Sequence, residues 1–249
     1  MMIELIEPDW PAPAHVRAGT TTRLGGVSQG GFESLNLAGH VEDDPQAVAE
    51  NRQRLVVSLR LPGEPFWLTQ IHGCHIALGD RDRPGCNADG VYTSRSRVVC
   101  AVLTADCLPL LLTDRDGREI SAVHAGWRGL ASGIIEQAVT RMRAPAESIL
   151  AWMGPAIGPA AFEVGDEVRD VFVKQAAEDA LAFAAGRPGH WWADIYQLAR
   201  QRLNRAGVGF ISGGDYCTVA DRERFFSYRR DGVTGRMASL IWLEPKKIS

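Results

Sequence analysis

The chain has 249 residues, of which 45% are hydrophobic and 23% are charged. These proportions are typical of a globular protein that is long enough to bury a sizeable core without disulfide bonds. The formal net charge is only −3, which excludes a global field that would gather nucleic acid or an anionic membrane. We therefore expect no nucleic-acid or membrane partner, and any anion site must be local.

The sequence starts without the basic and apolar segments of a signal peptide, and it contains no apolar stretch that approaches the length of a membrane span. Its five cysteines are an odd number without a regular spacing, which favours reduced thiols or metal ligands over a disulfide framework. Both features predict a cytoplasmic protein. The sequence does not specify an oligomeric state, so a monomer is the default expectation.

The N-terminal part of the chain reads as a long loop followed by a helix. Residues 19–40 are rich in Gly, Ser and Thr, which predicts an irregular loop, and loops of this length in compact domains are usually functional. Asp44 and Pro45 are typical of a helix cap and a first helical position, and apolar residues recur at helical spacing as far as Leu59.

Three apolar runs follow, at residues 65–73, 98–114 and 118–127, each bounded by Gly, Pro or Asp. Their shortness and their partly β-branched content predict buried strands. The third run leads through two glycines into a helical pattern that extends to Met142. This arrangement indicates a strand, a tight turn and a helix.

In the C-terminal part, the pattern predicts helices at residues 166–185 and 194–206, the second capped by Asp194. It predicts strands at residues 148–153 and 236–243. Strands and helices are therefore mixed along the whole chain.

No repeat, low-complexity tract or shift in composition marks a boundary between domains. We therefore expect a single domain over residues 1–249. Its fold class should be α/β (α+β mixed), with a largely buried mixed β-sheet flanked by helices.

Three side chains suited to metal binding lie where predicted buried strands end. His72 and His124 are each followed within two residues by glycine, and Cys107 is followed closely by proline. Two imidazoles and a thiolate form a ligand set that zinc favours, with a fourth position left for water or substrate. The long gaps between them match no compact metal motif, so spacing alone also allows a core cysteine and two histidines bonded to backbone. Cys74 and His75 are rival ligands.

Short strings along nearly the whole chain resemble the YfiH/YlmD-like laccase-domain family, among them TTRLGGVS, QIHG, TADCLP, HAGWRGL and FFSYRRD. The resemblance implies a YfiH-like fold, with zinc, or copper as an alternative metal, bound by His72, Cys107 and His124. It implies purine nucleoside phosphorylase activity on adenosine, inosine and methylthioadenosine, with adenosine deaminase activity in the same pocket. Purine nucleosides and phosphate would then be the partners. Some members are instead described as polyphenol oxidases or as peptidoglycan editing factors.

Two polar residues near these positions have both a functional and a structural interpretation. Asp106 precedes Cys107 and is a candidate to orient a ligand or to move protons; the alternative is a carboxylate that caps a turn. Arg23 lies in the glycine-rich loop and resembles a family position, and a guanidinium offers phosphate a two-pronged donor. The alternative for Arg23 is to hold the loop through hydrogen bonds to carbonyls.

Further candidates for contact with substrate or phosphate are Asn36, Arg128, Ser227 and Arg229, and His40 also follows the loop. Arg128 starts a predicted helix, where free backbone N–H groups favour an anion. Ser227 and Arg229 lie in a segment that we interpret as a strand, in which neighbouring arginines point to opposite faces. At most one of those arginines should then reach the site.

Three other functions remain open. Cys107 activated by His124 would give a Cys-dependent amidase or hydrolase of the kind expected in peptidoglycan precursor editing. A copper-dependent, laccase-like polyphenol oxidase normally assembles its cluster from H-x-H pairs, whereas this chain has six histidines and no such pair. A binding module with structural zinc would need a fourth protein ligand.

Overall fold

The computed structural model describes residues 3–244 and has the expected mixed α/β fold. The strands are β1 (Leu5–Ile6), β2 (Val16–Thr21), β3 (Pro65–Phe66), β4 (Ile76–Leu78), β5 (Gly90–Thr93), β6 (Val99–Thr104), β7 (Leu108–Asp114), β8 (Ile120–Ala125), β9 (Ile149–Met153), β10 (Glu163–Gly165), β11 (Phe183–Ala185), β12 (His190–Ala193), β13 (Phe210–Gly213) and β14 (Met237–Leu243). The helices are α1 (Pro45–Leu59), α2 (Trp127–Ala131), α3 (Ile134–Arg141), α4 (Asp166–Gln175), α5 (Ile195–Arg205) and α6 (Tyr228–Asp231), with short 3-10 helices η1 (Gly30–Phe32), η2 (Ala146–Ser148) and η3 (Ala177–Ala182).

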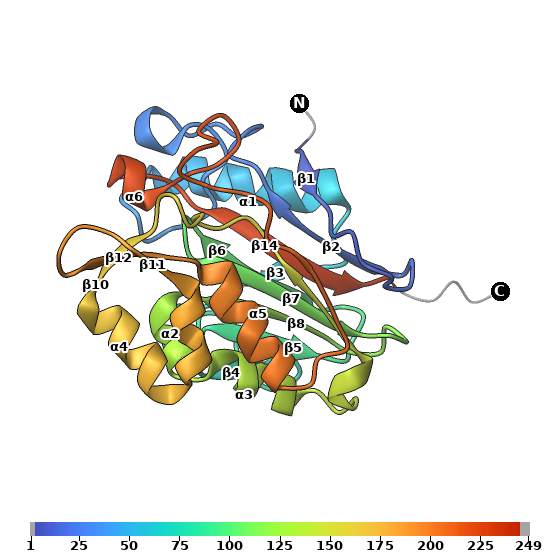
Figure 1. The fold of residues 1–249 in the computed structure, drawn as a ribbon. Helices are drawn as coiled ribbons and strands as arrows, with labels where there is room; N and C mark the ends of the chain where they lie inside the picture. Colours follow the sequence, from blue (N-terminus) through green and yellow to red (C-terminus); the bar gives the residue numbers. More distant parts are fainter. Residues whose placement is uncertain (1–2, 245–249) are drawn as a thin grey trace.

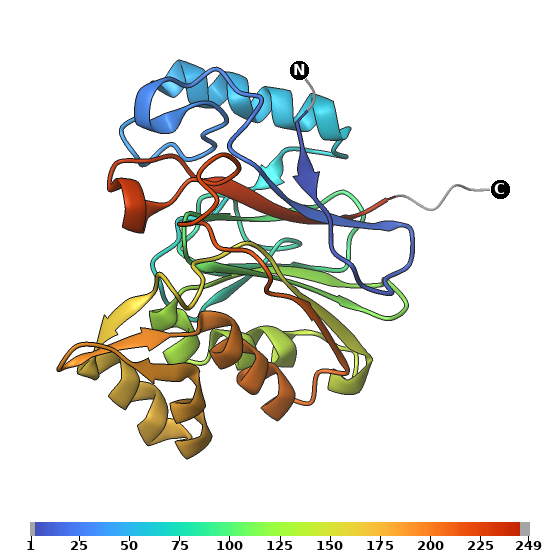
Figure 2. The ribbon, with the colours of Figure 1, turned by 45° about the horizontal axis from the view of Figure 1, so that its top comes forward.

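The strands form two large sheets and a small one, where the sequence pattern suggested one mixed sheet. The first has the order β1-β2-β14-β6-β3, the second β13-β9-β7-β8-β5-β4, and the small one β10-β12-β11. Parallel pairs, such as β13 with β9, occur beside antiparallel ones, so both large sheets are mixed. The two large sheets stack, with α1 outside the first and α2, α3 and α5 outside the second (Figures 1 and 2).

Each interface between these layers has its own apolar core. Along β6, alternate side chains face opposite ways: Cys100 and Val102 pack between the sheets, whereas Ala101 and Leu103 pack toward α1. This period of two is what a strand buried on both faces requires. On the other side of the second sheet, β7 and β8 pack against α3 and α5, with Ile134 among the buried residues.

Several predicted elements are confirmed. Helix α1 runs from Pro45 to Leu59, and the carboxylate of Asp44 caps it by accepting from the backbone N–H of Gln46 at 2.9 Å. Helix α5 follows the predicted cap Asp194, whose side chain accepts from the N–H of Gln197 at 2.9 Å. The strands expected near residues 148–153 and 236–243 are β9 and β14.

The single helix expected over residues 166–185 is wrong. Helix α4 ends at Gln175, and the chain continues as η3 and then as strand β11. Tertiary contacts override the helical pattern here, because Asp179 is buried and accepts from Arg205 of α5 at 2.8 Å. Strand β11 pairs with β12, which a helix could not do.

Three other segments differ from expectation. The first apolar run is a strand only at Pro65–Phe66, and the second is two strands, β6 and β7, separated by a turn. The expected loop over residues 19–40 begins after β2 has ended at Thr21. The segment containing Ser227 and Arg229 is not a strand, because Ser227 caps the short helix α6 by accepting from the N–H of Arg230 at 3.2 Å.

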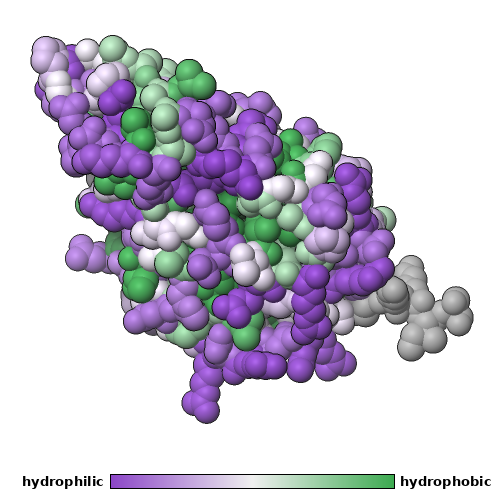
Figure 3. Space-filling model, turned by 60° about the horizontal axis from the view of Figure 1, so that its bottom comes forward, coloured by the Kyte–Doolittle hydropathy of each residue, from purple (hydrophilic) through white to green (hydrophobic). Residues whose placement is uncertain are grey.

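Helices α3 and α4 lie at the bottom of Figure 1, and Figure 3 turns that side forward. On this face, hydrophobic residues form several small groups separated by hydrophilic ones. Amphipathic helices produce this pattern when their apolar side is used to cover a sheet. None of the helices between residues 3 and 244 has the length and apolar character to cross a membrane.

Candidate metal centre

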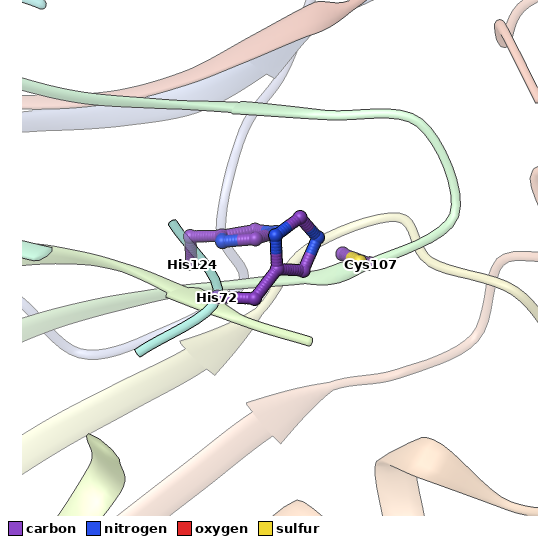
Figure 4. Close-up of side chains that lie close together, drawn as sticks. All are labelled: His72, Cys107 and His124. Carbon is purple, nitrogen blue, oxygen red and sulfur yellow. The ribbon is translucent and has the colours of Figure 1, made fainter. Parts of the chain in front are cut away.

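The fold brings His72, Cys107 and His124 together at one end of the two stacked sheets. One potential ligand atom from each lies within 4.8 Å of the others. Figure 4 shows the two imidazoles and the thiol directed toward one another, and the imidazole rings meet edge to face, with centroids 4.8 Å apart. The rivals Cys74 and His75 do not belong to this group.

The topology explains this convergence. Cys107 ends the turn by which the chain leaves β6 in one sheet and enters β7 in the other, so it lies where the gap between the sheets opens. His124 lies on β8, and because side chains alternate along a strand it shares a face with Ala122, which packs between the sheets. His72 reaches the same place from the irregular segment between β3 and β4.

Asp89 connects the two histidines. Its carboxylate is fully buried, and Oδ1 lies 2.8 Å from Nδ1 of His124. The same carboxylate accepts the backbone N–H groups of Ile71, His72 and Gly73 at 3.2, 2.9 and 2.7 Å. Since an ionised carboxylate can only accept, Nδ1 of His124 must carry the proton. The lone pair of His124 is then on Nε2 and is available to a metal.

The same contacts stabilise an unfavourable backbone conformation. His72 has φ of 59°, in the left-handed region that a histidine adopts only when its surroundings compensate. Three consecutive N–H groups pointing at one anion form the concave arrangement that such a turn produces. Asp89 thus fixes both the turn that carries His72 and the ring of His124.

A second aspartate holds the turn that carries Cys107. Asp106 has φ of 88°, and its two carboxylate oxygens accept from Oγ1 of Thr218 and from the backbone N–H of Arg229, both at 2.6 Å. Its backbone carbonyl accepts from Ile157 at 2.9 Å. These contacts favour the turn-capping interpretation of Asp106 over a role in proton transfer.

The charges of the cluster oppose the effect of burial. Burial alone would raise the pKa of the Cys107 thiol, but the neighbouring imidazoles of His124 and His72 lower it well below the ordinary value. Burial would lower the pKa of His124, whereas the Cys107 thiolate and the Asp89 carboxylate raise it. The pKa of Asp89 is likewise lowered, because its hydrogen bonds outweigh burial. A stabilised thiolate is the form in which cysteine binds metal.

The donor set fits zinc on chemical grounds. It comprises one thiolate and two imidazoles, one of which is oriented by a buried carboxylate, as is usual behind metal-binding histidines. The close approach of Gly126 provides further support. A Cβ at this position would lie 2.9 Å from Sγ of Cys107 and 3.4 Å from Cδ2 of His72, so only glycine leaves the ligands free to converge.

Two cavities open on either side of the cluster. The first, of about 350 Å³, is the more polar of the two and is lined by His40, Gln70, His72, Leu103, Thr104, Ala105, Cys107, His124, Tyr228 and Arg236. The second, of about 250 Å³, is more apolar and is lined by His72, Ala105, Asp106, Cys107, Trp127, Arg128, Ile157, Phe162, Ile195, Tyr228 and Arg229. His72, Ala105, Cys107 and Tyr228 contribute to both, so the cluster adjoins both cavities. We call the first the polar compartment and the second the aromatic compartment.

Residues 17–244 match the family model described as multi-copper polyphenol oxidoreductase laccase. The chain belongs to this laccase-domain family. A purine nucleoside phosphorylase of Pseudomonas aeruginosa is 53% identical over 96% of this chain and 98% of its own. The purine nucleoside phosphorylase YfiH of Escherichia coli is 51% identical over 97% and 100%.

Two solved structures of the family share the fold. A Neisseria meningitidis protein is 47% identical, with a TM-score of 0.93 over 97% of this chain and 99% of its own. YlmD from Geobacillus stearothermophilus is 33% identical, with a TM-score of 0.87 over 97% and 100%. The expected resemblance to the YfiH/YlmD-like laccase-domain family is therefore confirmed.

Three residues that the sequence suggested as substrate contacts of this laccase-domain protein lie elsewhere. Arg23 lines neither cavity, and its guanidinium donates to the carbonyls of Glu33 and Arg222 at 2.7 and 3.2 Å. Asn36 is buried, and its side chain is engaged with neighbouring loop residues and with the N–H of Arg236. Ser227 is buried as the cap of α6. All three hold the structure around the site.

Three other candidates do reach the cavities. Arg128 and Arg229 line the aromatic compartment, where Arg128 lies against the ring of Trp127 and Arg229 donates to backbone carbonyls. His40 lines the polar compartment. Both Arg128 and Arg229 can therefore reach the site. Of the neighbouring Arg229 and Arg230, Arg229 lines the aromatic compartment and Arg230 lines neither cavity.

Sequence reasoning missed two residues of the polar compartment, Thr104 and Arg236, and the aspartate behind His124, Asp89. These residues carry no local signal: Thr104 ends β6, Asp89 directly precedes β5 and Arg236 directly precedes β14, and the partners of these strands are distant in sequence. Thr104 and Arg236 line one cavity because β6 pairs with β14. Asp89 contacts His124 because β5 pairs with β8.

Proposed function

We propose that this protein is a zinc-dependent purine nucleoside phosphorylase that acts on adenosine, inosine and methylthioadenosine, with adenosine deaminase activity in the same pocket. One observation carries the proposal: His72, Cys107 and His124 converge between two cavities in a chain whose relatives at 51–53% identity are named purine nucleoside phosphorylases. The two compartments suit a substrate with a flat base and a polar sugar.

His72, Cys107 and His124 would hold the metal, and bound zinc would supply a Lewis acid with one open coordination position. The chain's own contribution is orientation. Asp89 keeps the proton of His124 on Nδ1, which fixes the ring and directs Nε2 to the cluster. Gly126 leaves the space that the ligand atoms need.

Phosphorolysis requires a bound phosphate and a bound nucleoside in one cavity. A phosphate oxygen forms a bond to C1′ of the ribose while the electron pair of the C1′–N9 bond leaves with the purine. The proton of hydrogen phosphate passes to the departing base, so the products are ribose 1-phosphate and the neutral purine. The protein must therefore supply donors for phosphate and a face for the base. The polar and aromatic compartments offer these two environments.

Deamination would use water in place of phosphate. Water adds to C6 of the adenine ring, ammonia leaves from the same carbon, and inosine is the product. Because this reaction needs no phosphate, the two activities can be separated by leaving phosphate out.

The geometry also favours a second candidate, a Cys-dependent hydrolase. Cys107, His124 and Asp89 form a thiol, imidazole and carboxylate series, with the thiol pKa lowered by the imidazoles. A nucleophile, a base and an orienting carboxylate are arranged in this order in covalent catalysis. A metal on the same thiolate would block that role, so metal content discriminates between the two functions.

The decisive experiment combines metal analysis with product analysis. We expect about one zinc per chain, and we expect inosine to yield hypoxanthine and ribose 1-phosphate only when phosphate is present. Cys107→Ser should remove both zinc and turnover, whereas Cys74→Ser, in a nearby partly buried cysteine outside the cluster, should retain both. Metal-free protein that cleaves amide substrates and loses that activity on alkylation would instead establish the hydrolase.

Oxidation of phenols, suggested by the description of the family model, should depend on added copper. The described residues contain one His/Cys cluster with three potential ligands, and a trinuclear centre needs many more. Zinc-loaded protein should therefore take up no oxygen with a phenolic substrate. Oxidation of phenols by copper-free protein would favour the oxidase over the phosphorylase.

A further inference from the structure

The polar compartment contains an arginine, Arg236, that is paired with no carboxylate among the described residues; its guanidinium lies 5.8 Å from the centroid of the exposed Tyr228 ring. Arg236 precedes β14 and donates through Nη1 to the backbone carbonyls of Thr234 and Gly235 at 2.7 and 3.0 Å. Within residues 3–244, Arg236 lies within 4.0 Å of no carboxylate, and its Nε and Nη2 donate to no protein group. Other arginines, such as the buried Arg202 and the exposed Arg205, are paired with carboxylates.

A guanidinium in this position is costly unless a counter-charge arrives. Arg236 is half-buried and lines the cavity. Burial lowers the pKa of its guanidinium, and the negative charges of Cys107 and Asp106 raise that pKa by less than burial lowers it. Neutral carbonyls satisfy its Nη1 atom alone. An unpaired buried cation is stabilised most by an anion that accepts two parallel hydrogen bonds, as phosphate does.

A second donor faces the same cavity. Thr104 is 2% exposed, and its Oγ1 has no hydrogen-bond partner. It ends β6, where it pairs in register with Met237, so it lies across the strand pair from the residue after Arg236. A buried hydroxyl without a partner costs free energy unless a ligand supplies one.

The neighbours of these two residues favour an anion over a cation. His40 lines the same cavity, and after burial its pKa is lowered by the guanidinium charges of Arg236 and Arg52. The amide of Gln70 is occupied at both ends by the backbone of Leu103, at 2.8 and 2.7 Å, so it forms a fixed wall. At the end of the compartment formed by His40 and Arg236, the nearby charges that act on His40 are therefore those of arginines.

The arginines of the other compartment are less suited to phosphate. Arg229 already donates to the carbonyls of Ala161 and Glu163 at 3.3 and 3.0 Å, and it is exposed. Arg128 is exposed and lies over the ring of Trp127 at 4.5 Å. Neither is accompanied by a buried hydroxyl without a partner among the residues lining that compartment.

We propose that Arg236 and Thr104 form the phosphate subsite of the catalytic cavity, so that phosphate and the purine base occupy opposite sides of the His72, Cys107 and His124 cluster. The proposal rests on the phosphorylase function proposed above. It places the attacking anion beside the polar wall and leaves the aromatic compartment to the base.

The test measures phosphate kinetics and phosphate binding in zinc-quantified protein. Arg236→Gln should raise the KM for phosphate in inosine phosphorolysis by about tens-fold to a hundredfold, and Thr104→Val by about threefold to tenfold, as expected for a charge-assisted and a neutral hydrogen bond. Arg236→Lys should recover part of the loss. The KM for adenosine in phosphate-free deamination should change little in all three.

Arg52→Gln is the matched control. Arg52 is also half-buried, lies over the ring of Trp67 and donates to a backbone carbonyl, but it does not line either cavity. Its KM for phosphate should stay within about twofold of the parent value. Zinc content should be the same in every variant.

Calorimetric titration with inorganic phosphate separates this proposal from the function on which it rests. Binding by the parent protein that Arg236→Gln and Thr104→Val both weaken supports the subsite even if no nucleoside is cleaved. If phosphorolysis is present and neither variant changes the KM for phosphate, the subsite is wrong and the function stands. If Arg236→Gln fails to fold, an unchanged phosphate KM in Thr104→Val overturns the proposal.

Discussion

The turns that carry His72 and Cys107 both hold a potential metal ligand in place, but they are anchored to different parts of the protein. Each contains a residue with a positive φ, His72 in one and Asp106 in the other, and each is anchored by an aspartate carboxylate. The carboxylate of Asp89 accepts the backbone N–H groups of the His72 turn, whereas that of Asp106 belongs to the Cys107 turn and accepts from residues outside it. Asp89 also contacts the imidazole of His124, so it acts on a metal ligand directly. Asp106 instead contacts Thr218 and the first turn of α6.

The difference separates two kinds of support. Asp89 determines where the proton of His124 resides and how the ring is oriented, and both affect affinity for a metal. Asp106 ties the Cys107 turn to α6, which brings the 61% exposed ring of Tyr228 to the mouth of both cavities. Disrupting the first should therefore weaken metal binding, whereas disrupting the second should alter mainly substrate binding.

Asp89→Asn should have the largest effect. Asp89 accepts four N–H donors, three from backbone and one from His124. An amide would direct its own N–H₂ group at some of them, and backbone donors cannot reverse. We expect zinc affinity to fall by about 10- to 100-fold, with a loss of stability of about 2–4 kcal/mol for a disrupted buried network. Competition with a chelator and thermal unfolding measure the two quantities.

The pH dependence of this variant follows from the lowered pKa of Asp89. Burial opposes ionisation, but the hydrogen bonds from His124 and the backbone outweigh it. A lowered pKa stabilises the fold at pH values above the unfolded value of about 3.9, and this stabilisation is lost as the pH falls through the folded value. The difference in unfolding free energy between parent and variant should therefore shrink below about pH 4. A difference that grows on acidification would contradict the assignment.

Asp106→Asn should have a smaller effect, which sharpens the comparison. The hydroxyl of Thr218 can reverse its role and accept from the new amide, while the amide oxygen still accepts from the N–H of Arg229. Asparagine also tolerates a positive φ. We expect zinc affinity to change by less than about threefold and the melting temperature to fall by about 2–4 °C, equivalent to about 1 kcal/mol in a chain of this size.

The readout that distinguishes the two aspartates is the KM for nucleoside set against zinc affinity. Asp106→Asn should raise the KM for nucleoside by several-fold while leaving bound zinc in place. Asp89→Asn should weaken zinc binding while leaving the KM of the zinc-loaded protein nearly unchanged. Equal zinc loss in both variants would mean that the Cys107 turn depends on Asp106 as strongly as the His72 turn depends on Asp89. Asp116→Asn, at an exposed turn remote from both, is the control.

Local signals in the sequence predicted much of the fold, and the resemblance to a known family implied the ligand set of the cluster. Asp44 and Pro45 mark the start of α1, and His124 lies one residue before the end of the buried strand β8, whereas Cys107 lies in the turn directly before β7 and does not end a strand. The resemblance to a known family selected His72 over its rivals, which spacing could not do. The predictions of a single sheet and of one helix over residues 166–185 were wrong. Both the two-sheet architecture and the end of α4 at Gln175 depend on contacts between segments that are distant in sequence.

The roles of the polar residues were harder to predict than their presence. A glycine-rich loop suggested that Arg23 meets a ligand, yet glycine allows a close approach to a carbonyl as readily as to a phosphate. Whether an arginine is available depends on how many of its donors are already used. Arg23 is engaged with two carbonyls and lines neither cavity, whereas Arg236 lines the polar compartment and its Nε and Nη2 donate to no group within residues 3–244.

Arg23→Gln should have the smallest effect on chemistry and tests whether a turn without a metal ligand can still influence the site. Arg23 donates to the carbonyls of Glu33 and Arg222, and its guanidinium lies 4.7 Å from the centroid of the Phe226 ring. Glutamine can replace at most one of these contacts, so we expect a loss of about 1–2 kcal/mol, or a melting temperature lower by about 2–8 °C. Zinc affinity and the KM for phosphate should stay within about twofold, because Arg23 lines neither cavity. A KM for phosphate that rises more than tenfold with unchanged stability would return the phosphate contact to Arg23. It would also show that the loop approaches the cavity more closely in the complex than in the free protein.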